Sequence, residues 1–346
     1  MANRSELPSP KQVKGELPLL ATEREFIELA RSKAMAIVQG EEDTRVAIVG
    51  PCSIHDPQSA IEYASRLAHL SSHLSGFLFP IMRFFVEKPR SRLGWKGLLY
   101  DPFLDESNEI GEGIRLSRKL LRQLAQMKIP CAAEFVDPLL APYFDDLLVW
   151  GVIGARTSAS QSHRQLASSL PFPVGFKNSI HGQIDVAIDG ALSAQAPHTH
   201  VGIDEEGKIG KITTQGNPFT HIILRGSTSE TNFTSEYISQ IEETLREEQI
   251  TLLIDCSHGN CGRKAELQKI SFESALTQMA QGNSIIRGLL LESHLHSGSQ
   301  PLPKNPSTLA YGVSITDPCL SWEETAELLI WGDQLLESSI SSVQKW

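Results

Sequence analysis

The chain has 346 residues, of which 40% are hydrophobic and 21% charged, and its formal net charge at pH 7 is -10. This negative charge and the absence of lysine and arginine runs argue against a nucleic-acid surface, and no apolar stretch approaches membrane-spanning length. The five cysteines have no paired spacing and the N-terminus has no signal-peptide core, so we expect reduced thiols and a cytoplasmic protein.

An extension precedes the first predicted strand. Pro8, Pro10 and Pro18 are followed by an amphipathic stretch over residues 22–39. We assign residues 1–44 to this extension, which we expect to contact a neighbouring subunit, and residues 45–346 to a single catalytic domain.

Eight short apolar runs follow, each typical of a strand that is buried on both faces of a parallel sheet. Nearly every run ends on, or is followed by, a charged or metal-ligating side chain. The runs cover residues 46–49, 80–86, 131–135, 152–155, 174–176, 221–224, 252–254 and 288–291.

Segments with helical periodicity alternate with these strands. They cover residues 59–74, 113–127, 138–150, 183–196, 235–247, 272–280 and 322–336. The alternation predicts an α/β protein with a parallel sheet. We favour a (β/α)8 TIM barrel over an open, doubly wound sheet, because residues with reactive side chains end all eight strands rather than gathering at one switch point.

A β-hairpin insert is predicted over residues 197–218, before the sixth strand of the barrel. Residues 199–203 and 208–214 flank a turn-like segment, Asp-Glu-Glu-Gly, at residues 204–207. A long loop rich in Gly, Ser and Pro is predicted over residues 297–307.

Four side chains are of types that bind borderline divalent ions. Cys52, His258 and Glu292 follow predicted strands 1, 7 and 8, which are neighbours in a closed barrel, and Asp317 precedes the last helix. Mixed S, N and O donors suit manganese, iron, cobalt or zinc. The alternative is that Cys52 is a small buried residue and that His258 and Asp317 make loop hydrogen bonds or cap a helix.

Cations gather at or after the same strand ends. An isolated cation there is costly unless it meets an anion, so the set predicts a pocket for phosphates and carboxylates. Taken singly, each cation is also compatible with a salt bridge, for example to Glu87 or Glu134. The set comprises Arg83, Lys88, Arg90, Arg92, Arg156, Lys177 and Arg225.

Nine motifs occur in order along the chain. They are GPCSIHDP at residues 50–57, EKPRS at 87–91, GWKG at 94–97, GARTSASQSHRQLAS at 154–168, PVGFKN at 173–178, HIILRG at 221–226, DCSHGN at 255–260, ESHL at 292–295 and SITDPCLSWE at 314–323. Together they resemble the type I, aromatic-regulated microbial 3-deoxy-D-arabino-heptulosonate 7-phosphate (DAHP) synthases. The resemblance spans essentially the whole chain, including the extension and the hairpin insert.

The resemblance implies that phosphoenolpyruvate condenses with erythrose 4-phosphate and water to give DAHP and phosphate, the first step of the shikimate pathway. The implied metal ligands are Cys52, His258, Glu292 and Asp317. The implied phosphoenolpyruvate site contains Arg83, Lys88, Arg156, Lys177 and Arg225.

Further residues complete the implied site. Arg90 and Ser91 would hold the phosphate of erythrose 4-phosphate, with Ser91 where the family usually has Thr. Either Lys88 or His258 is the candidate proton carrier, and Glu134 and Asp317 are candidates for organising water or metal.

The resemblance also implies a homodimer or homotetramer, inhibited by an aromatic amino acid in a pocket that involves the extension and the insert. Gly202 stands where phenylalanine-sensitive relatives often carry Ser, which favours Tyr or Trp as the effector. Two other interpretations stay open: a 3-deoxy-octulosonate 8-phosphate synthase that uses arabinose 5-phosphate, and a catalytically silent regulatory barrel that binds sugar phosphates.

Overall fold

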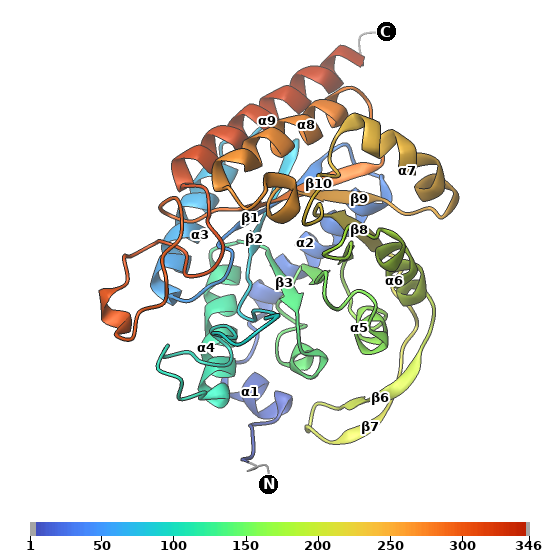
Figure 1. Ribbon diagram of the computed structural model, residues 1–346. Helices are drawn as coiled ribbons and strands as arrows, with labels where there is room; N and C mark the ends of the chain where they lie inside the picture. The colour runs from blue at the N-terminus through green and yellow to red at the C-terminus, as the bar shows by residue number, and fades with distance from the viewer. Residues whose placement is uncertain (1–4, 344–346) are drawn as a thin grey trace.

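Eight parallel strands close into a barrel in this computed structural model, which describes residues 5–343 (Figure 1). The order around the barrel is β1-β10-β9-β8-β5-β4-β3-β2, so the predicted fold is confirmed. The strands are β1 Arg45–Gly50, β2 Leu78–Arg83, β3 Cys131–Phe135, β4 Trp150–Ile153, β5 Val174–Lys177, β8 Thr220–Leu224, β9 Leu252–Asp255 and β10 Ile286–Glu292.

Helices surround the barrel and bury their apolar faces against it (Figure 1). Their starts follow from local chemistry: the Asp56 side chain caps α3 by accepting from the backbone N–H groups of Gln58 and Ser59. The helices are α2 Ala21–Gln39, α3 Pro57–Ser71, α4 Ile110–Gln126, α5 Gln161–Ala167, α6 Asp185–Gln195, α7 Ser235–Glu247, α8 Gln268–Ala280 and α9 Trp322–Val343. None of the described helices is both long and apolar enough to cross a membrane.

The prediction of a helix over residues 138–150 was wrong. Only a short 3-10 helix, η1 (Pro138–Tyr143), forms there, and Trp150 begins strand β4. Pro142 lies inside η1 and has no N–H to donate, which opposes an α-helix. Conversely, α5 was not predicted, and further 3-10 turns are η2 His258–Cys261, η3 Ala265–Leu267 and η4 Pro306–Thr308.

The predicted hairpin is confirmed as an antiparallel pair, β6 (Thr199–Ile203) and β7 (Ile209–Thr213), which stands away from the barrel (Figure 1). Its tip contacts helix α1 (Pro10–Glu16) of the extension: the backbone N–H of Lys11 donates to the carbonyl of Glu205 at 2.8 Å. Residues 1–4 of the predicted extension and 344–346 of the predicted domain lie outside the described residues.

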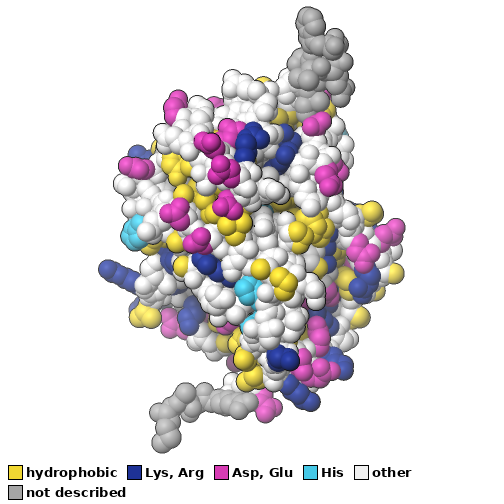
Figure 2. Space-filling view, turned by 90° about the vertical axis from the view of Figure 1, so that its right-hand side faces the viewer, with side chains coloured by type: hydrophobic (Ala, Val, Ile, Leu, Met, Phe, Trp, Pro, Cys, Tyr) yellow, Lys and Arg dark blue, Asp and Glu magenta, His cyan; other side chains and the backbone are white. Residues whose placement is uncertain are grey.

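The surface on the side of α6, α7 and the hairpin carries acidic, basic and apolar side chains intermixed (Figure 2). Most side chains packed in the barrel wall are apolar, and a buried histidine lies among them. His221 is fully buried with its ring 4.9 Å from that of Trp150, centroid to centroid.

Candidate active site at the C-terminal end of the barrel

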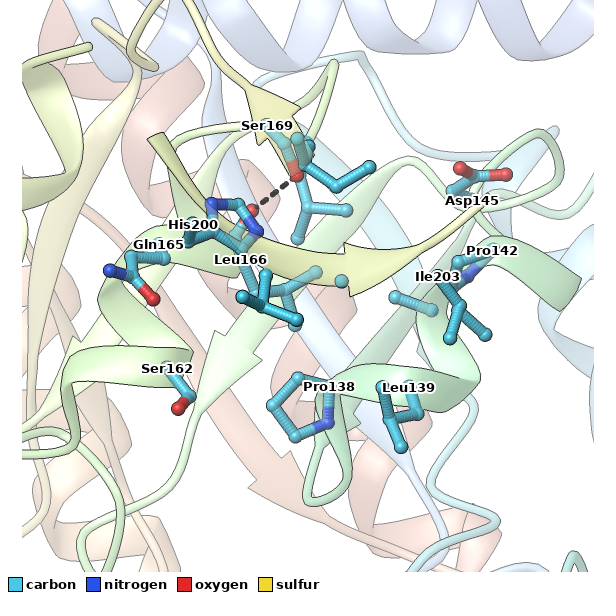
Figure 3. Close-up of a pocket in the computed structure, with 15 residues that line it drawn as sticks. Pro138, Leu139, Pro142, Asp145, Ser162, Gln165, Leu166, Ser169, His200 and Ile203 are labelled. Atoms are coloured by element: carbon cyan, nitrogen blue, oxygen red, sulfur yellow. Dashed lines mark hydrogen bonds between the residues drawn. The ribbon is translucent and has the colours of Figure 1, made fainter. Parts of the chain in front are cut away.

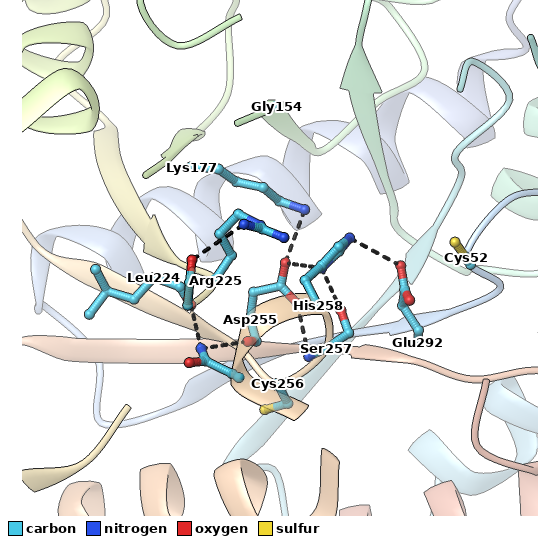
Figure 4. Close-up of polar contacts among 12 residues, drawn as sticks. Cys52, Gly154, Lys177, Leu224, Arg225, Asp255, Cys256, Ser257, His258 and Glu292 are labelled. Carbon is cyan, nitrogen blue, oxygen red and sulfur yellow. Dashed lines mark hydrogen bonds and ion pairs between the residues drawn. The ribbon is translucent and has the colours of Figure 1, made fainter. Parts of the chain in front are cut away.

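Three of the four predicted metal ligands meet at the C-terminal end of the barrel. Cys52, Glu292 and Asp317 each offer one ligand atom, and these atoms lie within 4.8 Å of one another. Gly50 of β1 pairs with Glu292 of β10, which places Cys52 beside this carboxylate. The fourth predicted ligand, His258, has its Nε2 atom 3.7 Å from Glu292 Oε1 (Figure 4).

The chemistry of this cluster fits a divalent cation. Burial raises the pKa of the Cys52 thiol to about 12, so ionisation of the thiol requires a nearby positive charge. Lys88 Nζ lies 2.7 Å from Cys52 Sγ and supplies one such charge. Burial alone would lower the pKa of Lys88, but the thiol and the carboxylates of the cluster raise it. A thiol, an imidazole and two carboxylates together suit manganese, iron, cobalt or zinc.

A buried carboxylate orients His258. Asp255 Oδ2 lies 2.9 Å from His258 Nδ1 and 3.0 Å from Lys177 Nζ (Figure 4). Burial alone would raise the pKa of Asp255, but His258 and Lys177 hold it well below its ordinary value. The other imidazole nitrogen of His258 is thereby left to face the ligand cluster.

Sequence reasoning did not assign a role to Asp255. The signal was available, because the residue ends strand β9 in the DCSHGN motif. His258, which contacts it, has a left-handed backbone with φ 57°, a conformation that no sequence spacing reveals.

A cationic cavity of about 430 Å³, which we call the reaction pocket, opens over this cluster. Within it, Arg156 Nε donates to Ser91 Oγ at 2.9 Å, and Arg90 Nε donates to the carbonyl of Trp95 at 2.7 Å. The side chains predicted for the two substrates are therefore adjacent. The predicted residues that line the pocket are Lys88, Arg90, Ser91, Arg92, Glu134, Arg156, Lys177, Arg225, His258 and Asp317.

Arg83 takes a different position from the other predicted cations. Its side chain is fully buried, pairs with Glu292 at 3.1 Å and stacks on Phe85, and it does not line the reaction pocket. Its Nη1 atom has no hydrogen-bond partner among the described residues. Arg83 thus lies beneath the ligand cluster and stabilises the Glu292 carboxylate.

Two further residues shape the pocket. Gly154 lies close to Glu134: a Cβ atom on Gly154 would stand 2.3 Å from the Glu134 carboxylate, which would have to move. Arg263, which sequence reasoning missed, also lines the pocket from the loop after β9.

A second cavity, of about 320 Å³, lies between the hairpin, η1 and α5, and we call it the hairpin pocket (Figure 3). Leu139 and Leu166 give it apolar walls, whereas Asp145, Gln165 and His200 give it polar groups. The described part of the extension, from residue 5 onward, does not line it, but Lys14 of α1 pairs with Asp145 at 3.0 Å.

Comparison with known proteins places the chain in one family. The model of the "DAHP synthetase I family" matches residues 21–330. The tyrosine-sensitive phospho-2-dehydro-3-deoxyheptonate aldolase of Escherichia coli (strain K12) is 41% identical, with 93% of this chain and 91% of the relative covered. The phenylalanine-sensitive enzyme of the same organism is also 41% identical, with coverage of 92% and 94%.

A solved structure agrees with this placement. The phospho-2-dehydro-3-deoxyheptonate aldolase from Francisella tularensis SCHU S4 superposes with a TM-score of 0.94 at 38% identity, and covers 97% of this chain and 98% of the other.

Proposed function

The chain belongs to the DAHP synthetase I family, and from that membership we propose that it condenses phosphoenolpyruvate with erythrose 4-phosphate and water, giving DAHP and inorganic phosphate. The observation that carries this proposal is the meeting of the ligand cluster and the cationic reaction pocket at one barrel end. The expected compartment is the cytoplasm.

The cations of the pocket bind and orient the two substrates. Arg156, Lys177 and Arg225 neutralise the phosphate and carboxylate of phosphoenolpyruvate, and Arg83 adds positive charge from beneath the pocket. Arg90 and Ser91 hold the phosphate of erythrose 4-phosphate. Because Ser91 accepts from Arg156, the two substrates are held against each other for carbon–carbon bond formation.

Proton handling falls to residues at the base of the pocket. Lys88 has a raised pKa and stays protonated, so it can donate to an oxygen that gains negative charge. Glu134 lies in the pocket wall and can orient the water that adds to the phosphate-bearing carbon.

The ligands Cys52, His258, Glu292 and Asp317 would hold one divalent ion. When bound, that ion supplies Lewis-acid polarisation of the aldehyde carbonyl.

Substrate choice tests this function. We expect phosphoenolpyruvate to be consumed with erythrose 4-phosphate and not with arabinose 5-phosphate. Turnover with arabinose 5-phosphate alone would instead assign the octulosonate reaction, and turnover with neither sugar would favour a silent barrel.

We also propose that the hairpin pocket binds an aromatic amino acid as a feedback inhibitor. Its apolar walls suit an aromatic ring, and its polar groups suit an amino acid backbone. Relatives described as tyrosine-sensitive and phenylalanine-sensitive support this class of effector. Gly202 lines the pocket, and its lack of a side chain favours tyrosine or tryptophan over phenylalanine as the effector.

A homodimer or homotetramer is the proposed assembly. Val201 and Ile209 on the hairpin are 77% and 81% exposed in the single chain, which supports a contact with a second copy. Light scattering of the purified protein tests this assembly.

A further inference from the structure

A third cavity, of about 510 Å³, adjoins the reaction pocket between the loops that follow β8 and β9. We call it the side chamber. It shares Arg225, Thr228, His258 and Arg263 with the reaction pocket, so the two cavities meet along these four residues. The remaining wall combines hydroxyl groups and apolar side chains, including Ser227, Ser229, Thr231, Phe233, Leu267 and Ile270.

Arg263 is the cation held at this boundary. Its backbone is left-handed, with φ 61°, and its N–H donates to the carbonyl of His258 at 3.0 Å. This conformation is energetically unfavourable for a residue other than glycine. The loop nevertheless adopts it at Arg263, and the arginine side chain lies where the two cavities meet. Among the described residues Arg263 makes no ion pair. The pKa of Arg225 is lowered first by burial, then by the positive charge of Arg156, and then by that of Arg263.

The reaction releases one anion that has to move out of the reaction pocket. The pocket cations hold the phosphate of the bound phosphoenolpyruvate, and the hemiketal formed after water adds must lose this group as inorganic phosphate. Its carbon–oxygen bond breaks, the electron pair leaves with the phosphate oxygen, and the hemiketal hydroxyl passes its proton to the departing phosphate as the carbonyl forms. The sugar-phosphate end of the product still occupies Arg90 and Ser91 at that moment.

We infer that the side chamber is a second oxyanion subsite, in which Arg263 and Thr228 bind the inorganic phosphate that leaves the reaction pocket. The inference rests on the proposed function. Glu230 also lines the chamber and is exposed, and its carboxylate opposes tight retention of phosphate. A subsite that binds phosphate weakly suits release.

Product inhibition tests the subsite, with inorganic phosphate as the probe. In the wild-type enzyme we expect mixed inhibition against phosphoenolpyruvate, because phosphate still binds the chamber when phosphoenolpyruvate is saturating. In Arg263→Gln we expect inhibition to become competitive only. Arg263→Lys should restore mixed inhibition, and Lys264→Gln, an equal charge change on the neighbouring exposed residue, should leave it intact.

Two results would overturn the inference. Competitive inhibition in the wild-type enzyme would mean that phosphate uses only the phosphoenolpyruvate site, and a parallel rise of KM and the phosphate inhibition constant in Arg263→Gln would make Arg263 part of that site. Calorimetric titration with phosphate at saturating phosphoenolpyruvate gives the same comparison without turnover. If the protein were inactive with both sugars, the proposed function would be wrong. The calorimetric titration would still show whether phosphate binds the side chamber, because it does not depend on turnover.

Discussion

A single carboxylate oxygen joins the two halves of the candidate active site. Asp255 Oδ2 contacts His258, a proposed metal ligand, and Lys177, a proposed phosphoenolpyruvate ligand. Asp255 is fully buried, so neither contact is weakened by water. Metal binding and substrate binding thus depend on the same side chain.

Asp255→Asn is expected to weaken metal binding by about 10- to 100-fold, because an amide cannot accept from both neighbours as the carboxylate does. Competition with a chelator measures this affinity directly, without an activity assay. Asp189→Asn, a matched change on the exposed face of α6, should have no effect. Equal metal affinities in the two variants would contradict the role given to Asp255.

His221 makes stability depend on pH. Burial lowers the pKa of His221 from 6.5 to about 3, and its Nε2 atom has no hydrogen-bond partner among the described residues. Below pH 6.5 the unfolded chain takes up a proton that the folded chain excludes, so the free energy of unfolding falls as pH falls toward 3. At about 1.4 kcal/mol per pH unit, the loss between pH 7.5 and pH 5 is about 2 kcal/mol.

Urea unfolding at these two pH values measures that loss. His221→Leu, which has no titrating group, is expected to lose about 2 kcal/mol less than the wild type over this interval. An identical pH dependence of both proteins would rule out His221 as the cause.

At the scale of elements, helix α1 links the extension to the hairpin pocket. Lys14 pairs with Asp145, which lines the pocket, and with Glu205 at the hairpin tip, at 3.0 and 2.8 Å. Tyr143 of η1 donates to the carbonyl of Pro8 at 2.6 Å. The extension therefore contacts both η1 and the hairpin on the outer side of the hairpin pocket, and stabilises their positions.

Deletion of residues 1–20 is expected to abolish inhibition by tyrosine and phenylalanine while turnover is kept, because the pocket walls lose this brace and the active site does not. Lys14→Gln should weaken inhibition. Lys11→Gln should not, because Lys11 contacts only exposed groups at the hairpin tip, where ion pairs contribute little. Full inhibition of the deletion variant, measured over a range of effector concentrations, would reject the role of the extension.

The elements also show where sequence reasoning failed. The hairpin was predictable because its turn residues and alternating strands are local signals. Residues 138–150 carry enough apolar residues for a helix, but the barrel takes Trp150 into strand β4 and Pro142 interrupts the rest. Tertiary packing overrode the local pattern there.

At the scale of the whole molecule, the barrel was predictable because apolar strands alternate with helical segments along most of the chain. The strand ends then brought Cys52 and Glu292 together, as neighbouring strands require. What the sequence did not reveal was orientation: Arg83 is buried beneath the ligand cluster, and Arg263 reaches the pocket from a left-handed turn. Such positions depend on backbone angles and packing, which spacing does not encode.

The most direct test of the account is to remove bound metal with a chelator and follow phosphoenolpyruvate consumption before and after adding manganese, iron, cobalt or zinc. The expected result is loss of turnover on chelation and its return with erythrose 4-phosphate when a divalent ion is restored. Turnover that survives complete chelation, or that no divalent ion restores, would contradict a metal-dependent DAHP synthase at the mouth of this barrel.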